Sequence, residues 1–172
     1  MKKNVIIGFY GNTKDRSVGG AERWERWRPT LSLFEHEDFL VDRFHLLVND
    51  DQDPSARRLI KDIHIVSPET EIVEHVLNLS DYWDFEEVYG ELHDFVNGYD
   101  WRTDEEDYLF HITTGSHATQ ICTFLLTESR HFPGRLLQSS PPRRRRGASE
   151  SQYHIVDLDL SRYDRLASRF HQ

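Results

Sequence analysis

A short polar stretch, Thr113 to His117 (Thr-Thr-Gly-Ser-His), lies between an apolar run and a segment with helical periodicity. In a strand–turn–helix arrangement, the backbone N–H groups and hydroxyls of such a turn can point at an anion held on the helix N-terminus. A glycine inside the turn lets a phosphate approach the backbone closely. The same residues could instead serve the fold, with Ser116 or Thr114 capping the helix. The spacing leaves both interpretations open.

The loop Gly8 to Thr13 (Gly-Phe-Tyr-Gly-Asn-Thr) is a second place where the backbone could approach a ligand. It lacks the three glycines of the dinucleotide fingerprint and the Gly-Lys-Ser/Thr of a P-loop. We therefore expect no nucleotide cofactor, and no cofactor of another kind.

Two histidines and one cysteine are the remaining candidates for chemistry near the polar turn. His111 and His117 flank the turn, but their separation is not a recognised metal-ligand spacing. A strand histidine is more often packed or hydrogen-bonded. Cys122 lies beside apolar helix residues, which favours a core thiol over a reactive one. We expect no metal site and no catalytic residue.

The charge of the chain is unevenly distributed. The formal net charge is −9, yet residues 1–30 carry +4, residues 31–110 carry −17, and residues 111–172 carry +4. Four consecutive arginines, Arg143 to Arg146, could attract polyanions or could form a solvated loop. The two basic ends become informative if the fold brings them to one crevice.

Short apolar runs alternate with amphipathic segments along the chain. The segment Ala21 to His36 could contain either a helix that starts near Pro29 or a short extra strand. The longer helix after Ser116 is expected to bury Ala118, Ile121, Cys122, Leu125 and Leu126. Strands are predicted over Asn4–Phe9, Val41–Val48, Glu71–Leu79, Asp107–Ile112, Arg135–Ser139 and Tyr153–Leu160, and helices over 54–66, from the capping box Asp84–Glu87, over 117–130 and over 161–170.

This alternation predicts an α/β fold: a Rossmann-like, mostly parallel sheet with helices on both faces. In such sheets a ligand binds outside the carboxyl ends of the strands, where the strand order reverses. If Asn4–Phe9 and Asp107–Ile112 are neighbours, the loop Gly8 to Thr13 and the turn Thr113 to His117 face each other across that crevice.

Composition excludes several classes of protein. A length of 172 residues favours one domain. The longest apolar run near the start, Val5 to Tyr10, is too short for a signal peptide or a membrane span. A single cysteine excludes an internal disulfide framework and a cysteine-based zinc site. We expect a soluble cytoplasmic domain with no membrane partner.

Several stretches together resemble the amino-terminal region of RtcR-type transcription activators. The resemblance extends over nearly the whole chain and is specific in its motifs. The stretches that carry it are 4–13, Gly19–Thr30 (Gly-Gly-Ala-Glu-Arg-Trp-Glu-Arg-Trp-Arg-Pro-Thr), Ser67–Thr70, Trp83–Gly90, 111–117, Gln138–Pro142 and Asp157–Tyr163.

The resemblance implies a CARF domain (CRISPR-associated Rossmann fold) over residues 1–172. It would be the sensor of a sigma-fifty-four (sigma-N) dependent activator of RNA repair. In that family an AAA+ ATPase domain and a helix-turn-helix domain follow the sensor, and we expect both to be absent from this chain. CARF domains usually act as dimers and bind RNA ends or cyclic oligonucleotides over the loops after the first and fourth strands.

The implied ligand is RNA with a damaged end carrying a 2′,3′-cyclic phosphate, as on tRNA fragments. The implied partners are this RNA, the AAA+ domain of the same full-length protein and a second copy in a homodimer. One alternative is a ring-nuclease-like enzyme that cleaves cyclic oligonucleotides, and another is a dimerisation module with an empty crevice. The implied ligand-binding residues are Gly11, Asn12, Thr13, Lys14, Thr113, Thr114, Gly115, Ser116 and His117.

Overall fold

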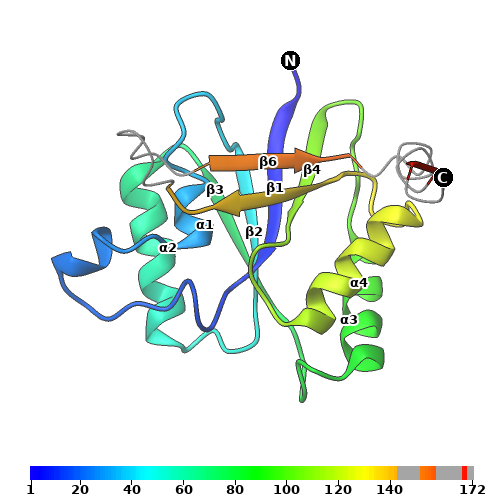
Figure 1. The fold of residues 1–172 in the computed structure, drawn as a ribbon, viewed down its shortest axis with the longest axis horizontal. Coiled ribbons are helices and arrows are strands. Elements are labelled where there is room, and N and C mark those ends of the chain that lie inside the picture. The colour runs from blue at the N-terminus through cyan, green and yellow to red at the C-terminus, as the bar shows by residue number, and fades with distance from the viewer. Residues whose placement is uncertain (143–151, 158–167, 170–172) are drawn as a thin grey trace.

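The computed structural model describes residues 1–142, 152–157 and 168–169. Its centre is a six-stranded sheet in the order β3-β2-β1-β4-β5-β6 (Figure 1). Neighbouring strands are parallel except for β6, which is antiparallel to β5 at one edge. The strands are β1 (Lys3–Phe9), β2 (Arg43–Val48), β3 (Glu71–Val76), β4 (Glu106–His111), β5 (Arg135–Ser140) and β6 (Gln152–Val156).

Helices cover both faces of the sheet. The short α1 (Pro29–Ser32) and α2 (Pro54–Val66) pack on one face, in a hydrophobic cluster that includes Leu31 and Leu59. On the other face, α3 (Phe85–Gly98) and α4 (His117–Glu128) share a cluster that includes Leu92 and Cys122. The predicted Rossmann-like architecture is confirmed.

The start of α3 follows the predicted capping pattern in part. The Asp84 carboxylate accepts hydrogen bonds from the backbone N–H groups of Glu86 and Glu87, which satisfies two donors of the first turn. A full capping box would have Glu87 return to the N–H of Asp84. Its carboxylate instead accepts from the hydroxyl and the N–H of Ser80, so it fastens the loop before α3 to the helix.

The segment Ala21 to His36 forms two short helical turns. A 3-10 helix covers Ala21–Trp24, and α1 begins at Pro29, so the extra strand left open from the sequence is not formed. Proline is favoured at the first position of a helix because its fixed φ suits the helix and because an N–H at this position would have no partner within the helix.

The buried face of α4 differs from the predicted one. Ile121 and Leu125 were expected in the core but are 51% and 37% exposed. Thr119, Thr123 and Thr127 are buried in their place. Each threonine hydroxyl donates to a backbone carbonyl three or four residues earlier, so these side chains enter the core without an unsatisfied donor.

Some predictions concern residues beyond those described. The last strand was expected to reach Leu160 and is described as far as Val156. The run Arg143 to Arg146 lies outside the described residues, as does all of the final predicted helix except 168–169. Within the described ranges, no helix combines the length and the apolar character needed to cross a membrane.

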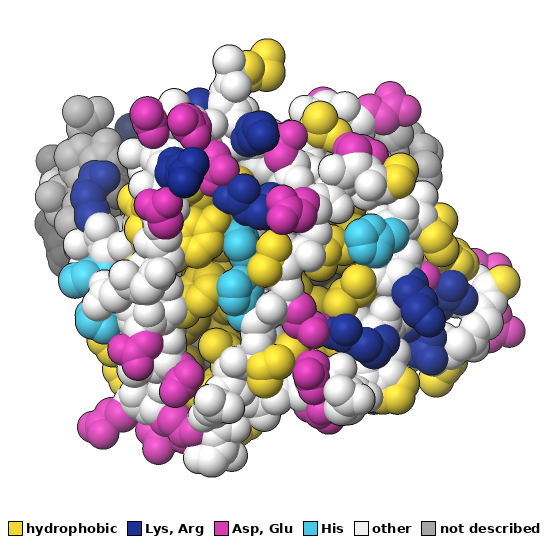
Figure 2. Space-filling view, turned by 180° about the vertical axis from the view of Figure 1, so that it is seen from behind, with side chains coloured by type: hydrophobic (Ala, Val, Ile, Leu, Met, Phe, Trp, Pro, Cys, Tyr) yellow, Lys and Arg dark blue, Asp and Glu magenta, His cyan; other side chains and the backbone are white. Residues whose placement is uncertain are grey.

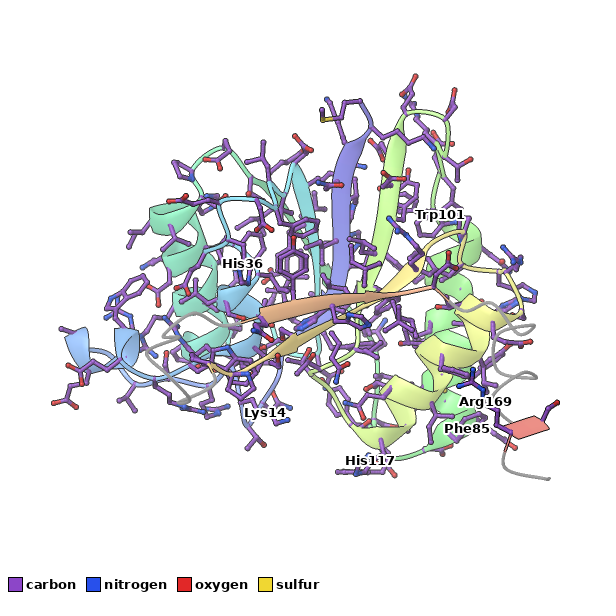
Figure 3. All side chains as sticks on the ribbon, turned by 45° about the horizontal axis from the view of Figure 1, so that its top comes forward. Lys14, His36, Phe85, Trp101, His117 and Arg169 are labelled. Carbon is purple, nitrogen blue, oxygen red and sulfur yellow. The ribbon has the colours of Figure 1, made fainter. Side chains whose placement is uncertain are left out.

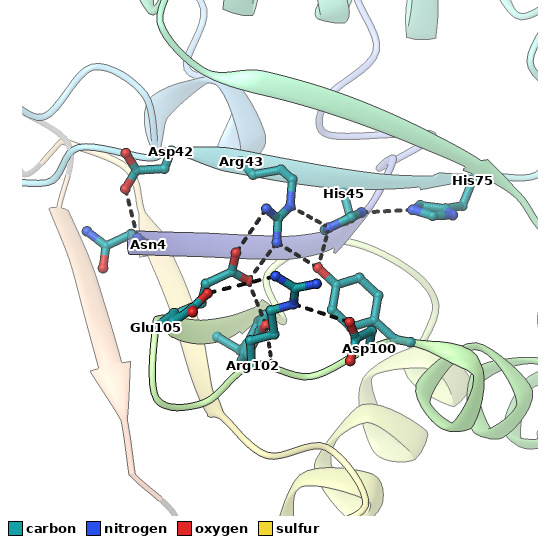
Figure 4. Close-up of polar contacts among 11 residues, drawn as sticks. Asn4, Asp42, Arg43, His45, His75, Asp100, Arg102 and Glu105 are labelled. Carbon is teal, nitrogen blue, oxygen red and sulfur yellow. Dashed lines mark hydrogen bonds and ion pairs between the residues drawn. The ribbon is translucent and has the colours of Figure 1, made fainter. Parts of the chain in front are cut away.

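A polar network joins β2 to β4 across the amino end of β1 (Figure 4). Two nitrogens of Arg43 lie 2.6 and 3.0 Å from the carboxylate oxygens of Glu106. Arg43 also donates to the Tyr99 hydroxyl at 2.8 Å. A bidentate arginine–carboxylate pair fixes orientation as well as distance, so the network holds the central strands in register at this edge.

His45 extends this network to β3. Its Nε2 accepts from Arg43, which can only donate, so the proton lies on Nδ1 and points at Nε2 of His75, 2.8 Å away. The pKa of His45 is lowered to about 4, mainly by burial and in part by His75 and Arg43, while Glu106 opposes the shift. The folded state therefore holds His45 neutral.

The pKa of His45 predicts a loss of stability in mild acid. Between pH 6.5 and 4 the unfolded chain binds a proton at this position that the folded chain does not, so stability falls as the pH falls. The expected loss in free energy of unfolding is on the order of 3 kcal/mol. Urea unfolding of His45→Gln should show a smaller loss over this window than the unsubstituted chain. His64→Gln, at an exposed position, is the matched control, and equal losses in all three proteins would refute the assignment.

Candidate functional site

A cavity of about 430 Å³ lies at the carboxyl ends of β1 and β4. These strands are adjacent and parallel, so the loops that follow them meet at one edge of the sheet. Figure 3 shows Lys14 and His117 projecting at this same edge. All nine residues predicted to bind the ligand line the cavity: Gly11, Asn12, Thr13 and Lys14 after β1, and Thr113, Thr114, Gly115, Ser116 and His117 after β4.

The loop after β1 is shaped from inside by the buried carboxylate of Asp15. It accepts hydrogen bonds from the N–H of Gly11 at 2.9 Å and from the N–H and hydroxyl of Thr30 at 2.9 and 2.6 Å. Burial raises the pKa of Asp15, and these three donors oppose the rise. The carboxylate thereby ties the loop to α1.

Arg26 holds the same loop from the outside. Its guanidinium donates to the backbone carbonyls of Thr13, Lys14 and Arg16. Arg26 therefore holds the loop through three backbone carbonyls, while the Asp15 carboxylate holds it from inside. The side chains of Asn12, Thr13 and Lys14 remain exposed at the mouth of the cavity.

The hydroxyls of the turn after β4 are engaged by the protein itself. Thr114 donates to the carbonyl of Phe9 at 2.7 Å, and Thr113 accepts from the N–H of Ser139 at 2.8 Å. The Ser116 hydroxyl caps α4 by accepting from the N–H of Thr119 at 3.2 Å. The structural interpretation of these hydroxyls is therefore the one that the geometry supports.

Backbone donors remain for a ligand at this turn. The Ser116 hydroxyl accepts from the N–H of Thr119. The N–H groups of His117 and Ala118 also lie at the start of the helix, where no intrahelical acceptor exists. Gly115, with φ of +99°, gives the turn its shape. An anion at this position would meet backbone N–H groups and the positive end of the α4 dipole.

The charge of the cavity differs from that of the chain. Among the described lining residues there is no Asp or Glu, and Lys14 contributes a cation. A larger cavity of about 970 Å³ is lined by four acidic residues and two arginines: Glu25, Glu35, Glu37, Asp38, Arg26 and Arg28. Asp and Glu are also spread over much of the face seen in Figure 2. An anionic ligand is therefore favoured in the smaller cavity.

Comparison with known proteins places the chain in a family. The family described as "RtcR: Regulator of RNA terminal phosphate cyclase" matches residues 2–172. The chain belongs to the RtcR family. The "Transcriptional regulatory protein RtcR" of Escherichia coli (strain K12) is 50% identical over 173 residues, which cover 99% of this chain. The chain spans 32% of the length of that relative.

A solved structure confirms the CARF-type fold of this RtcR-family chain. It is that of "Enterococcus italicus Csm6 bound to cyclic hexa-2'-fluoro-hexa-dAMP", with a TM-score of 0.67 over 98% of this chain and 46% of the other. At 15% sequence identity, the likeness concerns the fold.

Aromatic residues outside the predicted ligand-binding set form another wall of the cavity in this RtcR-family chain. Tyr82 and Trp83, from the loop between β3 and α3, line the cavity together with Tyr10. The Ser116 hydroxyl donates to the carbonyl of Tyr82 at 2.7 Å and so connects this loop to the turn. The sequence signal that could have indicated Trp83 is its place in a polar stretch directly before the N-cap residue of a helix.

His111 and Cys122 are packed residues, as expected. His111 is 1% exposed and its Nε2 lies 2.8 Å from the Ser139 hydroxyl, while burial lowers its pKa to about 3. Burial raises the pKa of the Cys122 thiol to about 11, so the nucleophilic thiolate is disfavoured. In the described part of the chain, no group of His, Cys, Asp and Glu is arranged to hold a metal ion.

The turn at Gly115 should tolerate no side chain. A Cβ there would lie 2.4 Å from the Thr119 hydroxyl, and the φ of +99° disfavours any L-residue. Gly20 is a matched control, since its φ is +119° and a Cβ there meets nothing within 4 Å. We expect Gly115→Ala to lower the free energy of unfolding by about 3 kcal/mol and Gly20→Ala by about 1 kcal/mol. Equal losses in urea unfolding would contradict the crowding described at this turn.

Proposed function

We propose that this chain is the ligand-sensing domain of an RtcR-type transcription activator and binds RNA ending in a 2′,3′-cyclic phosphate. The observation that carries the proposal is the cavity at the carboxyl ends of β1 and β4. Its described lining residues include no Asp or Glu, although the chain has a net charge of −9. The name of the family, which refers to RNA terminal phosphate cyclase, supports an RNA end as the signal.

Backbone N–H groups at the start of α4 would hold the cyclic phosphate. Gly115 gives the turn the conformation that exposes these N–H groups, and Lys14 would close over the phosphate from the opposite loop as a point charge. Such a site selects concentrated negative charge in a small space. A 3′ end that carries only hydroxyls offers no such charge to these donors.

A nucleotide ligand is also supported by the likeness to Csm6, whose structure is described with a cyclic oligonucleotide bound. In the full-length protein, AAA+ ATPase and helix-turn-helix domains would follow residues 1–172, and ligand binding would control the ATPase. This regulation would take place in the cytoplasm.

We also propose that the domain forms a homodimer through the exposed apolar surface of α3 and α4. Phe85, Ile121, Phe124 and Leu125 are 37–51% exposed, and the two helices pack side by side. A two-fold contact uses the same patch twice, so a modest apolar surface is sufficient. The start of α4 also lines the cavity, which would bring two ligand sites near one interface.

End sensing is tested with short RNAs that differ only in their 3′ end. We expect the 2′,3′-cyclic phosphate RNA to bind more tightly than the hydroxyl-ended RNA, and Lys14→Ala to weaken it on the order of tenfold, because a hydrogen bond to a charged group is lost. Lys2→Ala, beyond the amino end of β1, is the control. Equal affinity for both ends in a titration would refute the proposal. Cleavage of the RNA during the titration would favour the enzyme alternative.

Self-association is tested by light scattering. The chain should form a dimer, and Ile121→Asp on α4 should produce a monomer because it places a charge in the apolar contact. Ile65→Asp is the matched control, since Ile65 is 65% exposed on α2, on the opposite face of the sheet. A monomer at every concentration, with and without RNA, would contradict this interface.

A further inference from the structure

The loop between β3 and α3 places an unusually exposed indole at the rim of the cavity. Trp83 is 68% exposed, more than any of the other three tryptophans of the chain. It lines the same cavity as Lys14 and His117. An aromatic side chain left largely in water beside a concave site is typical of a binding surface, because covering it is favourable by its large apolar area.

The position of Trp83 is fixed by hydrogen bonds on both sides. The backbone N–H of Trp83 donates to the carboxylate of Asp81 at 2.9 Å, and the backbone N–H of Asp84 donates to the carbonyl of Asp81. On the other side, the bond from Ser116 to the carbonyl of Tyr82 joins the loop to the start of α4. The backbone that carries the indole is therefore held in a defined place relative to the proposed phosphate site.

The orientation of the ring leaves it available for stacking. Its centroid lies 6.2 Å from that of His117, with 56° between the ring planes, so the two rings are tilted and not stacked face to face. His117 is the first residue of α4, whose N–H groups would face the phosphate. A nucleotide carries its base on the same ribose as its terminal phosphate, so a phosphate at α4 brings the base into the reach of the Trp83 indole.

We infer that Trp83 stacks on the base of the terminal nucleotide. The site then recognises a nucleotide end, with a base and a phosphate, and not a bare phosphate or an abasic sugar phosphate. Stacking on an aromatic side chain accepts every base, because each base has a flat π-face. This inference rests on the proposed function, and it adds the part of the ligand that the turn and Lys14 do not contact.

The test compares two RNAs with a 2′,3′-cyclic phosphate, one ending in adenosine and one whose last nucleotide lacks its base. In the unsubstituted chain, removal of the base should weaken binding about tenfold, the effect expected for loss of one base–aromatic stack. Trp83→Ala should bind both RNAs with the weaker affinity, and Trp83→Phe should retain most of the preference. Trp24→Ala is the control, since Trp24 is also an exposed tryptophan (38%) but lines the larger cavity and not this one.

Each outcome separates this inference from the proposed function. Equal affinity of the unsubstituted chain for the two RNAs would overturn the role of Trp83 and leave end sensing intact. A preference for the base that persists in Trp83→Ala would overturn it too, and a change of oligomeric state in that variant would assign Trp83 to the dimer interface. If neither RNA bound the unsubstituted chain, the proposed function itself would fail.

Discussion

The parallel pairing of β1 with β4 is the constraint on which the site depends. The register from Lys3 opposite Glu106 to Gly8 opposite His111 places the ends of both strands at the same level. The loops that follow must then face each other, and the bond from Thr114 to the carbonyl of Phe9 closes the base of the space between them. At the other end of the strands, the pair of Arg43 with Glu106 spans β1 and holds its neighbours in place.

Much of the fold could be predicted because its signals are local. Apolar runs bounded by loops gave the strands, and the cap at Asp84 gave the start of α3. The buried face of α4 could not be predicted in this way, because Thr119, Thr123 and Thr127 satisfy their hydroxyls within the helix and so pack like apolar residues. Composition alone does not show which threonines do this.

The place of the cavity could be predicted, but the atoms that it offers to a ligand could not. Strand order brought the two loops together, as expected for a Rossmann-like sheet. The hydroxyls of Thr113, Thr114 and Ser116 support the turn, because a buried or turn-bound hydroxyl finds a nearby backbone partner first. This leaves the backbone N–H groups and Lys14 to face a ligand. Trp83 was missed because its loop has no periodicity that assigns it to a face.

The central claim is that an RNA end binds between the loops after β1 and β4, and amide NMR tests it most directly. Titration with an RNA carrying a 2′,3′-cyclic phosphate should move the backbone amide signals of Gly11 to Lys14 and of Gly115 to Ala118 most strongly. The same RNA with a hydroxyl end should leave those signals nearly in place. Shifts centred instead on the acidic cavity around Glu25 to Asp38, or equal shifts with both RNAs, would contradict the account.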